Sequence, residues 1–133
     1  MANDLCTTYA NRLIDWALAT GSPTRPSAVY VALGTGSSST GLSGELSGNG
    51  YARQSATFDA ASNRATSNAT LIEFGPNTTS NWGTVSHMGI YDASTGGNCI
   101  WAGSLSAAKT ASVGDKITFQ VGALDVLFSQ YAD

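Results

Sequence analysis

Three consecutive apolar segments in the second half of the chain constrain its fold most. They are residues 84–91, 99–105 and 116–128. In the third segment Ile117, Phe119 and Val121 alternate with polar residues, which is the two-residue period of a strand with one buried face. The segments therefore predict three β-strands in sequence, with a turn at 92–98 and a loop at 106–115 between them.

The apolar period of the third segment shifts by one residue after Gly122 and Ala123. Leu124, Val126 and Phe128 then continue the apolar series. One extra residue at a glycine is typical of a β-bulge or of a strand that bends around a sheet corner. In both cases we expect the segment to supply core residues on either side of the shift.

The beginning of the chain has a helical pattern instead, and we predict a helix over residues 3–20. Its apolar residues recur every three or four positions and share one face; they are Leu5, Cys6, Tyr9, Leu13, Trp16 and Ala17. Asn3 or Asp4 is the expected N-cap, and Gly21 and Pro23 end the helix. Because so short a helix is marginal alone, we expect its stripe to pack on the chain's own sheets, with a partner chain as the alternative.

Further strands are predicted between this helix and the C-terminal segments. They are residues 28–33, 51–58 and 69–74. The stretch 34–50 is rich in Gly and Ser and is predicted to be a long loop, which is usually either functional or mobile. Leu42 and Leu46 in this loop have no period, so we expect them to be poor core residues and candidates for docking on a neighbouring subunit.

Short strands at about ten-residue spacing, separated by polar turns, predict a mainly β fold. We expect an antiparallel β-sandwich, jelly-roll or immunoglobulin-like, over residues 28–128, with one N-terminal α-helix. A chain of 133 residues suits one domain, and neither a repeat nor a linker divides residues 1–133.

Composition limits the partners of this domain. Charged residues are 11% of the chain, against about 25% in ordinary domains, which suits a protein packed against neighbours. The net charge is −3 and the six basic residues are scattered, so we expect no nucleic-acid partner. No apolar stretch approaches the ~20 residues of a membrane span, so we expect no membrane partner. The N-terminus also lacks the pattern of a secretory signal.

The residues that could support catalysis are few. His87 is the only histidine, and a catalytic triad would need it together with Asp92 or Asp115 and a nearby serine. No Gly-x-Ser-x-Gly motif is present to expose such a serine. We therefore expect a non-enzymatic protein without catalytic residues, in which His87 is hydrogen-bonded within a strand.

Metal and cofactor sites are not expected either. One histidine and the two distant cysteines, Cys6 and Cys99, do not make a zinc site, and we expect two buried free thiols, with a single disulfide as the alternative. Residues 92–97 resemble the start of a calcium loop, but Gly103 occupies its twelfth position, so a hairpin turn is preferred. Two glycosylation sequons, at 68–70 and 77–79, are expected to be chance matches.

Trp82 lies in a polar turn at residues 77–83. Because aromatic residues dominate interface hot spots, it joins Leu42 and Leu46 as a candidate interface residue. The alternative is that it covers the end of the sandwich.

Several sequence runs together resemble a known family. They are Tyr-Ala-Arg-Gln at 51–54, Trp82 through Asn98, and residues 109–124, together with the N-terminal helix and the strand at 28–33. The combination is similar to a family of small structural proteins of tailed bacteriophages, described as tail fibre protein-like, some of which resemble capsid decoration (cement) proteins. The chain departs from the family pattern most in the loop 34–49 and at its cysteines.

The resemblance implies a virion component without catalysis, assembled in the cytoplasm of the host bacterium. We expect a capsid decoration protein that stabilises the head shell by binding the major capsid protein or other virion proteins. By analogy with cement proteins we expect a homo-oligomer, with a trimer favoured. The alternative is a tail fibre or tail adaptor domain that binds a receptor or another tail protein.

Overall fold

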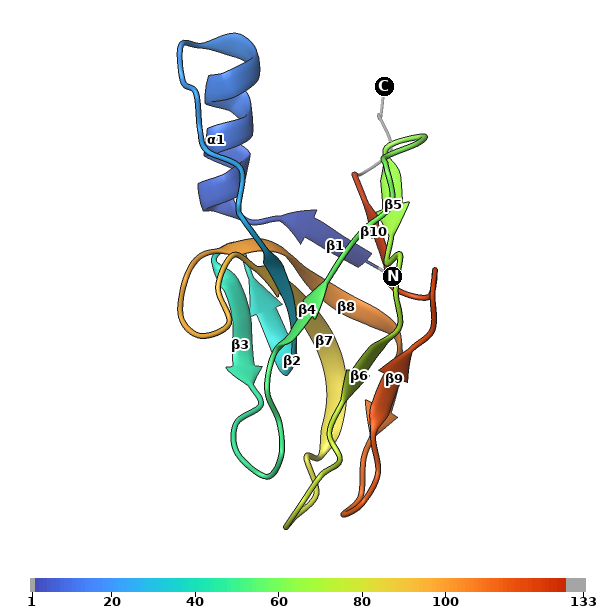
Figure 1. The fold of residues 1–133 in the computed structure, drawn as a ribbon. Coiled ribbons are helices and arrows are strands. Elements are labelled where there is room, and N and C mark those ends of the chain that lie inside the picture. The colour runs from blue at the N-terminus through green and yellow to red at the C-terminus, as the bar shows by residue number, and fades with distance from the viewer. Residues whose placement is uncertain (1, 129–133) are drawn as a thin grey trace.

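The computed structural model describes residues 2–128 and is mainly β, with antiparallel sheets and one helix in that range (Figure 1). In chain order the elements are β1 (Ala2–Leu5), α1 (Thr7–Leu18), β2 (Val29–Ser38), β3 (Gly41–Glu45), β4 (Gln54–Ala56), β5 (Ala65–Ser67), β6 (Ile72–Phe74), β7 (Thr84–Tyr91), β8 (Cys99–Thr110), β9 (Ile117–Phe119) and β10 (Asp125–Leu127). No helix in this range has the length and apolar character that a membrane span requires.

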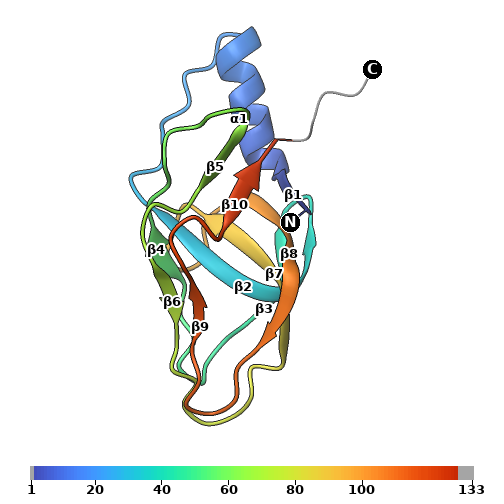
Figure 2. The same cartoon turned by 90° about the vertical axis from the view of Figure 1, so that its right-hand side faces the viewer.

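One large sheet faces two small ones. The large sheet has the strand order β1-β8-β7-β2-β3, and β4 also pairs with β2. The pairs β6-β9 and β5-β10 form the small sheets, which lie together on the other side of the molecule (Figure 2). The arrangement is an open antiparallel sandwich, as the sequence predicts.

The main core lies between these layers. Strand alternation directs Val31 and Leu33 of β2 inward from the large sheet, while Ile72 and Phe74 of β6 face them from the opposite layer. Ala32, between the two β2 residues, belongs instead to a second buried cluster with Cys6, Tyr91, Cys99 and Ala102. Both cysteines are buried and free, as expected from the sequence.

The predicted strand over residues 116–128 is divided into β9 and β10, which pair with β6 and β5 respectively. The chain turns between them, with the Ala123 N–H donating to the Gln120 carbonyl at 2.9 Å. The phase shift therefore marks a sheet corner and not a bulge. Because Val121 lies in this turn it is 63% exposed, so its predicted place in the core is wrong.

The helix is shorter than predicted. Ala2–Leu5 forms a strand against β8, and the Cys6 N–H donates to the Ile100 carbonyl at 2.8 Å. Cys6, with extended backbone and no side-chain capping bond, is the N-cap, so the expected caps Asn3 and Asp4 are wrong. Of the apolar stripe that is expected to pack on the sheets, Cys6 is buried in the second cluster, but the expectation is wrong for α1 itself, because none of its residues is buried.

The predicted loop over residues 34–50 is mostly a β-hairpin. β2 continues to Ser38 and β3 returns beside it, so that Gly34 pairs with Glu45. A Cβ at Gly34 would lie 3.0 Å from the Gly44 carbonyl oxygen, which explains why a glycine is suited to this part of the strand. A Cβ at Gly36, Gly41 or Gly44 would meet side chains instead, so the glycines that predict a loop lie where the hairpin leaves no room for a side chain.

Other boundaries shift less. The predicted strands at 28–33 and 84–91 are confirmed, the first being extended. Those at 51–58 and 69–74 shorten to three residues each, and β8 continues to Thr110 through part of the predicted loop at 106–115.

Candidate interaction surface

Among the helices and strands of residues 2–128, α1 carries the most exposed large apolar side chains. Leu13 is 40% exposed, Ile14 53%, Trp16 65% and Leu18 82%. The helix stands at one end of the sandwich, projecting beyond the sheets (Figure 1). Its apolar face is therefore largely uncovered by the part of the chain that the structure describes.

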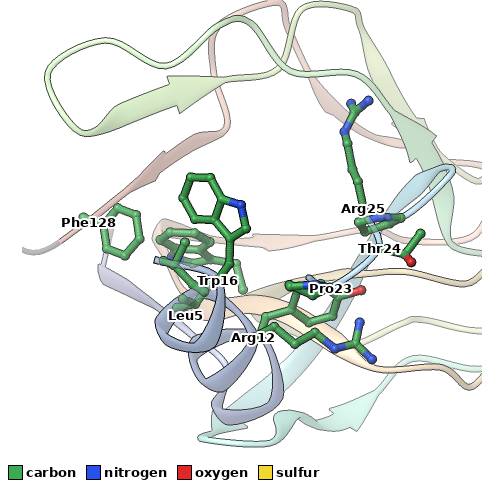
Figure 3. Close-up of a pocket in the computed structure, with 11 residues that line it drawn as sticks. Leu5, Arg12, Trp16, Pro23, Thr24, Arg25 and Phe128 are labelled. Atoms are coloured by element: carbon green, nitrogen blue, oxygen red, sulfur yellow. The ribbon is translucent and has the colours of Figure 1, made fainter. Parts of the chain in front are cut away.

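Two apolar grooves run along this face of α1. The first has a volume of about 550 Å³; its lining includes Tyr9, Leu13 and Trp16 of the helix, the segment 23–26, Trp101 and Phe128. The second, of about 330 Å³, includes Ala10, Ile14 and Leu127 in its lining and shares Leu13, Trp101 and Phe128. Figure 3 shows Trp16 beside Leu5 and Phe128, with Thr24 and Arg25 farther along the same groove.

The wall that the two grooves share is an aromatic pair. Phe128 meets Trp101 edge to face, with ring centroids 4.9 Å apart and an angle of 73° between the planes. Such a contact is a favoured geometry for aromatic rings and holds Phe128 in place. Phe128 nevertheless remains 44% exposed, so it extends the apolar surface of α1 onto the body of the protein.

The first half of α1 is attached to the body through a tyrosine. The Tyr9 hydroxyl donates to Asp92 Oδ2 at 2.8 Å, and Asp92 Oδ1 accepts from the Asn98 N–H at 2.8 Å. Burial, together with the carboxylate of Asp92, raises the pKa of Tyr9. Burial alone would raise the pKa of Asp92, but the hydrogen bonds from Asn98 and Tyr9 outweigh it and lower that pKa. Asp92 thus ties the helix to the turn 92–98.

Arg53 organises the other side of this turn. Its Nε and Nη2 donate to the two carboxylate oxygens of Glu45, each at 2.8 Å. Its Nη1 donates to the carbonyls of Ala93 at 2.9 Å and Gly96 at 2.8 Å. The guanidinium carbon also lies 3.8 Å from the centroid of the Tyr91 ring. One side chain therefore joins β3, the turn 92–98 and the end of β7.

Tyr51 connects the same carboxylate to the core. Its hydroxyl donates to Glu45 Oε2 at 2.9 Å and accepts from the Leu33 N–H at 3.1 Å. Its ring stacks on Phe74 at 6.0 Å and meets Trp82 edge to face at 6.1 Å. Burial is the main cause that raises the pKa of Tyr51. The run 51–54, which carries part of the family resemblance, is therefore a structural motif.

None of the three predicted interface residues lines the two grooves beside α1. Trp82 is buried in the main core and its Nε1 donates to the Asn49 carbonyl at 3.1 Å, which corresponds to the alternative that it covers the end of the sandwich. Leu42 and Leu46 are partly buried against the two core clusters, so the expectation that they are poor core residues is wrong. Their docking on a neighbouring subunit remains a prediction.

His87 has a hydroxyl partner but is not next to the predicted carboxylates. Ser86 Oγ lies 2.7 Å from His87 Nδ1 and 3.1 Å from the Thr35 carbonyl oxygen. Asp92 is bonded to Tyr9 and Asn98, and Asp115 accepts from the Ser112 N–H. Within residues 2–128 no group of three or more His, Cys, Asp or Glu residues is placed to hold a metal ion.

The asparagines of both sequons have structural roles. Asn68 is fully buried and its amide bonds to three backbone groups at the corner between β9 and β10. Asn77 is buried as well and donates to the Ala111 carbonyl at 3.0 Å. A glycan has no room at either side chain, so the sequons are chance matches.

No curated protein matches the sequence. The model of the family described as Podophage GP4 fiber I protein gp80 matches residues 4–127, which is nearly the whole chain. The chain therefore belongs to this family of tailed-phage structural proteins and is a component of the virion.

Proposed function

We propose that this protein is a non-enzymatic subunit of a fibre on a tailed-phage particle. The observation that carries the proposal is the match of residues 4–127 to a family described as a fibre protein. The expectation of capsid decoration rests on resemblance to cement proteins alone, and the family description names a fibre. The tail fibre alternative is therefore proposed in its place.

The use of the polar side chains supports a structural role. Arg53, Glu45 and Tyr51 are engaged with one another and with backbone groups. Asp92 is engaged with Tyr9 and Asn98. These groups hold turns and strands in place, and this accounts for their shifted pKa values without a catalytic task.

Assembly is the second part of the proposal. The partners are other virion proteins and further copies of the chain, with a trimer favoured, assembled in the host cytoplasm. Symmetric repetition multiplies modest contacts, so each subunit needs only moderate affinity for its neighbours.

Antibody labelling of intact particles tests the location. Gold-labelled antibody against this chain is expected to mark the tail or neck of the particle in electron micrographs, and particles from a deletion mutant are the control. Even labelling over the head shell would contradict the fibre assignment and favour capsid decoration.

A second experiment tests the absence of catalysis. A phage carrying His87→Ala is expected to form plaques with wild-type efficiency on its host, because the proposed function gives His87 no chemistry. A severe loss of infectivity with normal amounts of the protein in the particle would contradict a purely structural role.

A further inference from the structure

We propose that α1 and the grooves beside it form an assembly surface that packs against the same surface of a second copy of this chain. The inference rests on the proposed homo-oligomer and names the surface through which its copies meet. Three properties of α1 carry it.

The first property is that residues 2–128 give α1 little support. It has 12 residues, and none of them is buried. Isolated helices shorter than about 12–15 residues are marginal in water, and in proteins most helical stability comes from packing of the apolar face. The Tyr9–Asp92 bond holds only the first half of the helix. The second half, with Trp16 and Leu18, needs a partner.

The second property is the size of the uncovered surface. Aromatic side chains cover about 150–250 Å² each, and Trp16 is 65% and Phe128 44% exposed. With the exposed parts of Leu13, Ile14, Leu18 and Leu127, the apolar patch has an area on the order of 500 Å². This area is near the upper end of the range for the largest apolar patch on a monomeric protein. A standard interface takes about 800 Å² from each partner, of which roughly 57%, or about 450 Å², is apolar. The patch therefore matches what a stable pair of copies buries.

The third property is charge. Arg12 and Asp15 are the two charged residues of α1, and they have opposite signs. Arg12 lies at the rim of the first groove, with its guanidinium carbon 4.6 Å from the centroid of the Tyr9 ring. A second helix that carries the same pair offers an acidic partner to Arg12 and a basic partner to Asp15. The polar edge of the surface can thus pair with that of a neighbouring copy, whether two helices meet about a twofold axis or three pack about the threefold axis of the favoured trimer.

The test is the molar mass of the full chain in solution, measured by sedimentation velocity and light scattering over a dilution series. The wild-type protein is expected at an integer multiple of 13.6 kDa. Ile14→Glu and Trp16→Glu are expected to shift it to 13.6 kDa while keeping the circular dichroism of the β-sandwich, because both side chains are exposed in the single chain.

Val113→Glu is the matched control. Val113 is 57% exposed and lies in the connection between β8 and β9, at the end of the molecule opposite α1 (Figure 1). This variant is expected to keep the wild-type mass. Should the Glu variants fail to fold, Leu18→Ser removes one apolar contact and is expected to weaken association roughly tenfold; an unchanged dilution curve would overturn the inference.

The remaining outcomes separate the two proposals. If the wild type is oligomeric and the folded α1 variants keep its mass, α1 is not the interface, while the proposed fibre function stands. If the wild type is 13.6 kDa at every concentration, self-association through α1 is overturned. The labelling of particles tests the fibre assignment independently of both results.

Discussion

Arg53 and Glu45 form a two-point contact, with both carboxylate oxygens of Glu45 accepting from Arg53 at 2.8 Å. The Arg53 side chain is 8% exposed and that of Glu45 26%, so the pair is largely shielded from water. Because Arg53 also bonds two carbonyls of the turn 92–98, this contact links β3 to the turn that anchors α1. The run 51–54 carries part of the family resemblance, and its Arg53 therefore has a structural role: it holds β3 and the turn 92–98 together.

Arg53→Ala is expected to destabilise the fold by about 3 kcal/mol, because removing one partner of a buried pair leaves the other without compensation. Arg53→Lys is expected to recover little, since an ammonium does not reproduce the two-point geometry. The free energy of unfolding of both variants is measured by denaturation in urea. Lys116→Ala, which breaks the exposed pair that Lys116 forms with Glu73 at 2.9 Å, is the control and is expected to change stability by less than about 1 kcal/mol. Equal effects at Arg53 and Lys116 would contradict this explanation of the contact.

Acid is expected to weaken the fold through Glu45. Burial tends to raise the pKa of Glu45, but the hydrogen bonds from Arg53 and Tyr51 outweigh burial and lower it from its ordinary 4.5. A carboxyl whose folded pKa is depressed contributes stability that is present above its unfolded pKa and is lost as pH falls through the folded value. Melting temperature is therefore expected to fall as pH is lowered below about 4.5.

Glu45→Gln isolates this contribution, because the amide does not titrate. We expect the variant to be less stable than the wild type at pH 7 and to lose less of its stability on acidification. Asp92, whose pKa is also lowered, retains its own acid dependence in the variant. Parallel stability curves for the two proteins over the acid range would show that Glu45 contributes nothing to the pH dependence.

Two adjacent glycines provide a matched pair of substitutions. Gly96 and Gly97 have φ of 61° and 70°, so alanine is strained at both. A Cβ at Gly97 would lie 2.5 Å from Asp92 Oδ1 and 2.7 Å from the Ala93 Cβ, whereas at Gly96 nothing lies within 4 Å. Gly96→Ala is expected to cost about 1 kcal/mol, and Gly97→Ala clearly more because it also displaces Asp92. The melting temperatures of the two variants are compared by thermal unfolding. Equal melting temperatures for Gly96→Ala and Gly97→Ala would refute the steric role of Gly97.

Asn68 is expected to be essential to the corner between the two small sheets. Its amide donates to the carbonyls of Thr70 and Gln120 and accepts from the Leu124 N–H. Asn68→Ala leaves these buried groups without partners, and we expect a loss of about 2–4 kcal/mol in the free energy of unfolding. Asn68→Asp is expected to be no better, because a carboxylate repels the two carbonyls. Asn81→Ala, at an exposed position, should be nearly silent in the same denaturant experiment.

The strand periods of the sequence predict much of this fold. The alternation of apolar residues locates the strands at 28–33 and 84–91, and the glycine shift at residue 122 marks the sheet corner. The apolar period does not reveal the hairpin at residues 34–45, because its glycines fit positions without room for a Cβ and carry no apolar period. The helical pattern places the start of α1 too early, because residues 2–5 pair with β8 although the pattern continues through them.

The sequence predicts part of the candidate surface. The spacing reveals the apolar stripe of the helix but not what covers it, so the prediction that the stripe packs on the sheets is wrong for α1. Trp82 shows the opposite error: a polar turn surrounds it in sequence, yet the fold places it in the core against Tyr51. Local composition does not report such long-range contacts.

The most direct test of a fibre subunit is its copy number per particle, measured by quantitative mass spectrometry of purified virions against the major capsid protein. A fibre subunit is expected in a small number of copies, as a few symmetric fibres on each particle require. A molar ratio near parity with the major capsid protein, or a simple symmetric fraction of it, would contradict the fibre assignment and place the chain on the head shell.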